Sequence, residues 1–268
     1  MKLGVIGCGN MATAIVGGII EAGLIEPSEI IGADVSEAAV KKIKDTYGIN
    51  GTGDNKEAVV NSEILLLAVK PQYYQEMIGQ IKGEVTPGQL IISIAAGRSI
   101  EAVEKLFAPA EIKLIRLMPN TPALVGESMT AVCSNANVSP QELEEAMKLI
   151  RSFGKAQTVP ESLFDTVTAV SGSSPAYVFM FIEAMADAAV LGGMPRAQAY
   201  EFAAQSVLGS AKLMLETGKH PGELKDMVTS PAGTTIEAVR VLEELGLRSA
   251  VIEGVEACRK KSELMRKA

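Results

Sequence analysis

A short apolar run at the start of the chain leads directly into Gly7-Cys8-Gly9-Asn10-Met11-Ala12. The run, residues 2–7, has the composition of a strand covered on both faces, and a helical pattern begins at residue 10. Two glycines and a small residue at this spacing, between a strand and a helix, are typical of a turn that approaches a dinucleotide pyrophosphate. The N-terminal half is therefore expected to be an α/β fold.

Residues 1 to about 158 continue this alternation, with helical patterns such as residues 10–23 and 36–48 between apolar runs. The βαβ rhythm predicts a Rossmann-type, doubly wound parallel sheet with right-handed crossovers. The expected strands are residues 2–7, 29–34, 63–69, 89–95 and 112–118, and residues 129–134 and 156–159 could add strands at one edge.

Strand patterns fade after about residue 160. We therefore expect a dinucleotide-binding domain over residues 1–160 and an all-helical domain over residues 161–268. The second domain is rich in small and apolar residues, which fits either an ordinary bundle core or an intersubunit interface, and we favour an interface for part of it. The expected helices are residues 174–193, 195–217, 221–228, 234–245 and 247–265.

Each position of the glycine turn has a physical reason. Gly7 permits a sharp turn, Gly9 lets a pyrophosphate approach the backbone, and Ala12 lets the helix pack closely on the strand. The helix start would then supply free N–H groups and partial positive charge. The alternative is a tight turn that binds no ligand.

Asp34 ends the second expected strand, about 20 residues beyond the glycine turn, where a ribose-binding carboxylate is expected. A carboxylate there accepts hydrogen bonds from an adenosine 2′-hydroxyl and repels a 2′-phosphate. Asp34 therefore favours NADH over NADPH, although it could instead only cap the helix that begins near residue 36.

Two further strand ends carry small residues, Ala68-Val69-Lys70 and Ala95-Ala96-Gly97. Ligands of open α/β sheets bind beyond the carboxyl ends of strands, so both stretches could leave room for a nicotinamide ring. Lys70 could also be a solvated lysine. Asn120 and Thr121, after the fifth strand, are expected at the rim of the same crevice or in a purely structural turn.

Composition excludes several classes of protein. The net charge of −7 does not favour a nucleic-acid surface. Residues 174–194 are strongly apolar but include Glu183 and Asp187, which indicates a helix of a soluble protein rather than a membrane span. The N-terminus does not resemble a signal peptide. The three cysteines show neither disulfide nor metal spacing, which favours a reducing cytoplasm.

The second half offers no evident general base. Its histidine, His220, precedes a proline and is expected in a surface turn, and we can place no catalytic lysine near residues 171–179. A substrate that already carries a cationic C=N bond would need orientation and charge stabilisation more than a strong acid.

These residues resemble the pyrroline-5-carboxylate reductase family. The resemblance spans about residues 3–265 and is carried, in family order, by the motifs GVIGCGNMA, AVKPQ, SIAAG, MPNTPA, SGSSPAYVF, HPGELKDMV and SPAGTTIEAV. It implies reduction of 1-pyrroline-5-carboxylate to L-proline by NADPH or NADH, the last step of proline biosynthesis. It also implies homodimers formed through the helical domains, often assembled further into a decamer, with no nucleic-acid or membrane partner.

The resemblance also implies roles for individual residues. Thr235 would be catalytic, through a hydrogen bond to the pyrroline nitrogen. The substrate would be bound by Glu161, Ser171, Ser174, Thr234 and Thr235. The dinucleotide would be lined by Ile6, Gly7, Cys8, Gly9, Asn10, Met11, Ala12, Asp34, Asn55, Ala68, Val69, Lys70, Ala95, Ala96 and Gly97.

Three positions depart from the family pattern. Ser174 and Ala232 stand where glycine is usual, and both add little bulk. Asp34 replaces the smaller or hydroxyl residue of NADPH-preferring members. Two alternatives remain at this point: a relative of the 3-hydroxyacid dehydrogenases, which should have a catalytic lysine, and a dinucleotide sensor without catalysis.

Overall fold

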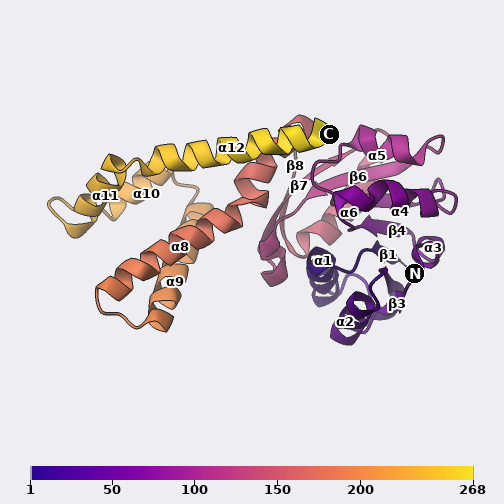
Figure 1. Cartoon of the computed structure of the whole chain (residues 1–268), viewed down its shortest axis with the longest axis horizontal. Coiled ribbons are helices and arrows are strands. Elements are labelled where there is room, and N and C mark those ends of the chain that lie inside the picture. Colours follow the sequence, from indigo (N-terminus) through magenta and orange to yellow (C-terminus); the bar gives the residue numbers. More distant parts are fainter. Residues whose placement is uncertain (1, 268) are drawn as a thin grey trace. The chain divides into compact units, whose positions relative to one another are not determined.

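The computed structural model describes residues 2–267, which form two compact units (Figure 1). The sheet unit comprises the residues up to Ser173 together with those from Cys258 onward, and the helical unit runs from Ser174 to Ala257. The units therefore divide later in the chain than the expected boundary at residue 160.

Within residues 2–267, the strands of the sheet unit form one sheet in the order β3-β2-β1-β4-β5-β6-β7-β8. From β3 to β6 all neighbouring strands are parallel, which confirms the doubly wound fold. The order reverses between β1 and β4, so a ligand crevice is expected where these two strands end. The strands are β1 (Leu3–Ile6), β2 (Ile30–Ala33), β3 (Asn50–Thr52), β4 (Ile64–Leu67), β5 (Leu90–Ser93), β6 (Lys113–Met118), β7 (Ser128–Ser134) and β8 (Gly154–Thr158).

Two features of the sheet differ from the expectation. The chain returns from β6 to β7 through a short 3-10 turn at Thr121–Val125, and β7 pairs antiparallel with β6. A connection this short cannot make a parallel crossover, which needs a dozen or more residues. The edge strand β3 was not expected, because its sequence, Asn50-Gly51-Thr52, is polar and carries no apolar pattern.

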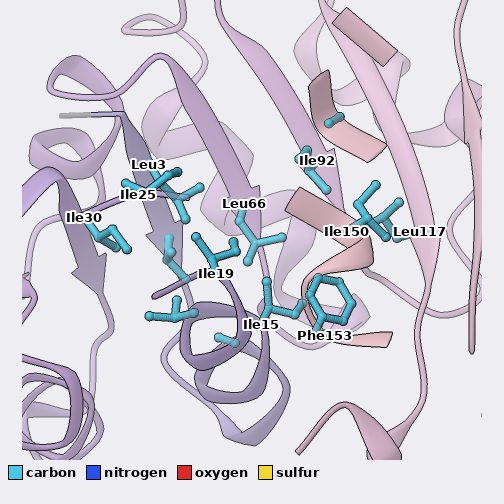
Figure 2. Close-up of a cluster of buried hydrophobic side chains, with 14 of the residues drawn as sticks. Leu3, Ile15, Ile19, Ile25, Ile30, Leu66, Ile92, Leu117, Ile150 and Phe153 are labelled. Atoms are coloured by element: carbon cyan, nitrogen blue, oxygen red, sulfur yellow. The ribbon is translucent and has the colours of Figure 1, made fainter. Parts of the chain in front are cut away.

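Helices cover both faces of the sheet, and alternate strand residues enter two separate cores. Leu66 of β4 packs with α1, α2 and α6 in the first core, whereas Leu65 and Leu67 pack with α3, α4 and α5 in the second. Figure 2 shows the first core, with Ile15 and Ile150 beside Leu66 and Phe153. The helices are α1 (Asn10–Glu21), α2 (Glu37–Tyr47), α3 (Asn55–Val60), α4 (Tyr74–Ile81), α5 (Ile100–Phe107) and α6 (Pro140–Arg151).

The helical unit consists of α8 (Ser174–Leu191), α9 (Arg196–Thr217), α10 (Pro221–Met227), α11 (Thr234–Glu244) and the first half of α12 (Leu247–Lys267). These bounds agree with the expected helices to within a few residues. Ala186 of α8 is buried with Ala199 and Ala203 of α9, so small side chains bring these two helices close together. Many large apolar side chains of this unit are exposed, including Phe179, Leu191, Phe202, Leu215 and Ile252.

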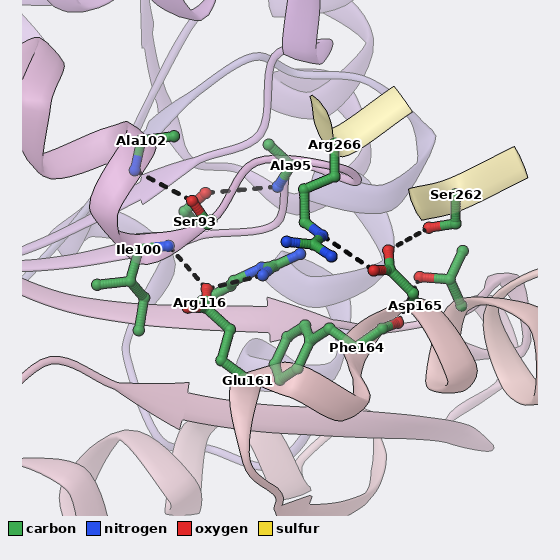
Figure 3. Close-up of polar contacts among 12 residues, drawn as sticks. Ser93, Ala95, Ile100, Ala102, Arg116, Glu161, Phe164, Asp165, Ser262 and Arg266 are labelled. Atoms are coloured by element: carbon green, nitrogen blue, oxygen red, sulfur yellow. Dashed lines mark hydrogen bonds and ion pairs between the residues drawn. The ribbon is translucent and has the colours of Figure 1, made fainter. Parts of the chain in front are cut away.

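The last turns of α12 belong to the sheet unit. There Ser262 Oγ donates to Asp165 Oδ1 over 2.7 Å, and Arg266 Nε donates to Asp165 Oδ2 over 2.9 Å (Figure 3). Asp165 lies in the short helix α7 (Phe164–Val167) and is only 7% exposed. Phe164 and Ala169 are also buried there, which explains why this unit extends past residue 160: the strands end, but the packing continues.

Candidate active site

The glycine turn connects β1 to α1 at the point where the sheet order reverses. Gly7 has a φ of +96°, and a Cβ at this position would lie 2.8 Å from the backbone carbon of Ala68. Gly9 is the N-cap of α1, and a Cβ there would meet nothing within 4 Å. The turn thus needs glycine at position 7 for packing, whereas the open space at Gly9 faces a possible ligand. Ala12, in the first turn of α1, is buried, as expected.

Asp34 lies beside this turn at the end of β2. Its Oδ2 accepts from the backbone N–H of Cys8 over 2.7 Å, and its Oδ1 accepts from the N–H of Ser36 over 2.8 Å. Burial, and secondarily the charge of Asp34, raises the pKa of the Cys8 thiol to about 12. Cys8 is therefore a neutral packed side chain that contributes its backbone N–H to the turn.

A hollow of about 360 Å³ opens next to Asp34. Asn55, at the start of α3, lies in it and donates to Gln80 Oε1 over 2.9 Å. The hollow brings together many of the expected cofactor residues: Ile6, Gly7, Gly9, Asp34, Asn55, Ala68, Val69 and Lys70.

A larger cleft of about 630 Å³ shares Gly9 and residues 68–70 with this hollow. It lies beyond the carboxyl ends of β1, β4, β5 and β6, where parallel sheets bind ligands. Of the expected residues it is lined by Gly9, Asn10, Met11, Ala68, Val69, Lys70, Ala95 and Ala96. Gly97 lies just beyond, with a φ of +72° that suits glycine in the turn.

The cleft also includes residues that the site prediction omitted. Pro71, Ile94, Met118, Leu124 and Gly172 line it, as do Asn120 and Thr121 at the expected rim. Position at a strand end is the signal that could have identified Met118 and Ile94. Gly172 lies within the motif SGSSPAYVF, whose residues 171–174 the family resemblance placed at the pocket.

Asn120 holds the cleft wall together. Its Nδ2 donates to the carbonyl of Ser171 over 3.0 Å, and its Oδ1 accepts from Ser128 Oγ and from the N–H of Met129, each over 3.0 Å. Ser171 and Gly172 end a π-helical turn, Thr168–Gly172, a geometry frequent at functional sites. Asn120 thus fixes the main chain of Ser171 beside the cleft.

Glu161 does not line the large cleft, and its carboxylate is held by residues of the sheet unit. Its Oε1 accepts from Arg116 Nη1 and from the N–H of Ile100, each over 2.7 Å (Figure 3). Arg116 is 3% exposed, and its guanidinium lies 4.3 Å from the ring centroid of Phe164. Breaking such a buried pair leaves an uncompensated charge, so these contacts give Glu161 a structural task. Glu161 lines a separate hollow with Glu104 and Cys133 rather than the large cleft.

In the helical unit, Thr234 and Thr235 open α11 as expected. The Gly233 N–H donates to the Ser230 carbonyl over 3.1 Å, and Ala232 within this turn has a φ of +55°. Gly233 is the N-cap and provides no side-chain cap, which leaves the first-turn N–H groups available to an anion. Ser174 begins α8 of the same unit.

His220 is an N-cap. Its Nδ1 accepts from the N–H of Gly222 over 3.1 Å at the start of α10, and the residue is exposed. This confirms the expected surface turn.

Comparison with known proteins identifies the family. A family model described as pyrroline-5-carboxylate reductase dimerisation matches residues 161–265, and one described as NADP oxidoreductase, coenzyme F420-dependent, matches residues 2–97. The pyrroline-5-carboxylate reductase of Escherichia coli (strain K12) is 51% identical over 267 residues, which cover 100% of this chain and 99% of that protein. The chain belongs to the pyrroline-5-carboxylate reductase family.

Solved structures agree with this assignment. The pyrroline-5-carboxylate reductase of Coxiella burnetii has a TM-score of 0.90 and 33% identity, with 98% of both chains covered. That of Plasmodium falciparum, solved with NADP bound, has a TM-score of 0.90 and 32% identity, with 99% of this chain and 98% of that chain covered. Family membership confirms the expected fold class, the class of oxidoreductase and NAD(P)H as cofactor.

The dimerisation match also shows that the chain self-associates. Among the described residues, one helical run, Glu161–Leu191, is long and apolar enough by composition to cross a membrane. The run opens the segment matched by the dimerisation model.

Proposed function

We propose that this member of the pyrroline-5-carboxylate reductase family reduces the C=N bond of 1-pyrroline-5-carboxylate with NAD(P)H and forms L-proline. The observation that carries the proposal is the cleft at the reversal of strand order, lined by the glycine turn and the ends of β4 and β5, in a chain similar to this family over its whole length.

The residues present fit the cofactor. The open space at Gly9 and the N–H groups at the start of α1 would hold the pyrophosphate. The hollow beside Asp34 and Asn55 would hold the adenosine ribose, and the small residues 95–97 would leave room for the nicotinamide. When bound, NAD(P)H supplies the hydride. We propose a preference for NADH, because the Asp34 carboxylate repels a 2′-phosphate.

The substrate would be held by the start of α11. The first-turn N–H groups and Thr234 would bind its carboxylate, and the Thr235 hydroxyl oxygen would accept a hydrogen bond from the protonated ring nitrogen. Ser171 and Ser174 would shape the ring pocket. Because a protonated C=N nitrogen already carries its proton, no general acid is needed before reduction. Glu161 would lie near the substrate ring, with its carboxylate held by Arg116 Nη1 and by the N–H of Ile100.

We further propose a dimer formed through the helical unit, assembled into a decamer, which works in the cytoplasm without membrane or nucleic-acid partners. The exposed apolar side chains of α8 and α9 support the dimer. The three free cysteines suit a reducing compartment.

The test is a cell-free assay of NADH and NADPH oxidation with 1-pyrroline-5-carboxylate. Substrate-dependent oxidation that yields proline is expected. Cofactor binding without turnover would instead favour a dinucleotide sensor. Oxidation of 3-hydroxyacids with reduction of NAD(P)+, without activity on 1-pyrroline-5-carboxylate, would favour a 3-hydroxyacid dehydrogenase.

A further inference from the structure

Two loops form the part of the cleft that the nicotinamide would occupy. The β4 loop, residues 68–71, follows β4, and the β5 loop, residues 94–98, follows β5. Leu67 and Ser93, the last residues of the two strands, are register partners in the parallel pair β4–β5. The separation of the loops therefore depends on contacts made at and beyond this last pair.

A buried tyrosine joins the two strand ends. The Tyr74 hydroxyl donates to the Leu67 carbonyl over 2.9 Å and lies 2.9 Å from Ser93 Oγ. Ser93 Oγ in turn accepts a hydrogen bond over 3.4 Å from the N–H of Ala95, the second residue of the β5 loop (Figure 3). The hydroxyls thus form a continuous chain from the end of β4 to the cleft residue Ala95.

The two hydrogen-bonded hydroxyls, of Tyr74 and Ser93, are polar groups in apolar surroundings. Tyr74 is 0% exposed and Ser93 is 1% exposed, and Tyr74 packs in an otherwise apolar core. Phenylalanine would fill the same volume without burying a polar atom, and a buried hydroxyl must find partners to offset its desolvation. The hydroxyl is therefore better explained by what it connects than by packing.

An arginine joins the same loops nearer the surface. Arg98 Nη2 donates to the Pro71 carbonyl over 3.2 Å, from the β5 loop to the β4 loop. The Arg98 N–H also closes a turn onto the Ala95 carbonyl over 3.5 Å, and Gly97 supplies the positive φ for this turn. The buried Tyr74 hydroxyl thus joins the two strand ends in the core, and the half-buried Arg98 guanidinium joins the two loops nearer the surface.

We propose that Tyr74 and Arg98 are positioning residues. They set the separation of the β4 and β5 loops and so shape the part of the cleft that the nicotinamide would occupy. The proposal rests on the function proposed above. The glycine turn and Asp34, which would hold the adenosine end, make none of these contacts. The β4 loop also lines the hollow beside Asp34, whereas the β5 loop lines the large cleft alone. Loss of either bridging hydrogen bond should therefore weaken binding of the intact cofactor more than binding of its ADP-ribose portion.

The experiment compares two ligands on the full-length protein. Kd is measured by calorimetry for NADH and for ADP-ribose with wild type, Tyr74→Phe and Arg98→Met. Loss of one buried hydrogen bond predicts a five- to tenfold higher Kd for NADH in each variant, roughly, and less than about a twofold change for ADP-ribose. Arg98→Lys, which keeps a donor, should recover part of the loss. Kinetics should show a raised KM for the cofactor.

Tyr47→Phe is the matched control, because it removes a tyrosine hydroxyl from α2 on the other face of the sheet. It should change neither Kd. The Arg98 variants keep the test decisive if Tyr74→Phe fails to fold, since Arg98 is only half-buried.

An equal rise in the Kd of NADH and ADP-ribose, or no change in either Kd, would overturn the proposal. The hydrogen bonds of Tyr74 and Arg98 would then support the fold alone. The proposed function fails separately. A wild-type protein that binds NADH but does not reduce 1-pyrroline-5-carboxylate contradicts that function. The comparison of NADH with ADP-ribose then still decides the role of Tyr74 and Arg98. Wild type that binds neither ligand contradicts both.

Discussion

The Asp34 carboxylate accepts a hydrogen bond from the backbone N–H of Cys8 over 2.7 Å, from the second strand to the middle of the glycine turn. Its other oxygen accepts from Ser36 at the start of the following helix. One side chain thus supports the turn and places a negative charge in the hollow proposed for the ribose.

Replacing Asp34 should change cofactor preference. Asp34→Ser removes the charge that repels a 2′-phosphate, so the ratio of kcat/KM for NADPH to that for NADH should rise about tenfold. Steady-state kinetics with both cofactors measures this. Glu26→Gln, which removes an exposed carboxylate elsewhere in the sheet unit, is the control. An unchanged ratio in Asp34→Ser would show that Asp34 does not discriminate between the cofactors.

The two turn glycines should respond differently to alanine. Gly9→Ala places a methyl group in open space, so the melting temperature should hold while the KM for NAD(P)H rises at least tenfold, roughly. Gly7→Ala should lower the free energy of unfolding by about 2–3 kcal/mol, because its Cβ would collide with residues 68–69 and its φ is positive. Thermal melts and kinetics separate the two. Equal effects of both changes on stability would contradict the open site at Gly9.

Thr235 should matter for turnover rather than for cofactor binding. Thr235→Ala removes one positioned hydrogen bond, and kcat should fall by roughly one to two orders of magnitude. Thr235→Ser keeps the hydroxyl and should retain most of the activity. If Thr235→Ala had wild-type kinetics, Thr235 would have no part in the reaction.

Ala232 should be a site of backbone strain. Among residues 2–267, Ala232 is the non-glycine residue with a positive φ, at +55°. Ala232→Gly should therefore raise the free energy of unfolding by about 0.5–1 kcal/mol. Ala238→Gly, in the middle of α11, should lower it by about 1 kcal/mol. Denaturant unfolding measures both, and a loss of stability in Ala232→Gly would show that the left-handed conformation is not strained.

Acid should weaken the start of α6. The hydrogen bond from Lys113, followed by those from Ser139, lowers the pKa of Glu142 from 4.5 to about 2. A lowered folded-state pKa stabilises the protein above the unfolded-state value, and this contribution disappears as the pH falls from about 4.5 to 2. Wild type should thus be more stable than Glu142→Gln near neutral pH, and the difference should vanish across this window. Lys113→Met should narrow the window, and a difference independent of pH would contradict the assignment.

The amino-acid pattern was sufficient for the strands β1, β2, β4, β5 and β6 and for the doubly wound class of the first half. Strand residues such as Leu65 to Leu67 are apolar on both faces, and burial on both faces is what that composition reflects. The glycine spacing was sufficient to locate the turn between β1 and α1, because Gly7 and Gly9 meet local backbone requirements. Residues 221–227 and 234–244 were recognised as helices from capping and turn residues that act over a few positions.

Contacts between distant parts of the chain were beyond such patterns. The polar strand β3 exists because β2 offers it a partner, and β7 runs antiparallel because its connection is short. Glu161 was expected near the substrate ring, but nothing in the sequence indicated that Arg116, 45 positions away, holds its carboxylate. Tyr74 and Ser93 meet only because β4 and β5 lie side by side. Local sequence controls local conformation, whereas the partner of a buried polar group depends on which strands the fold makes neighbours.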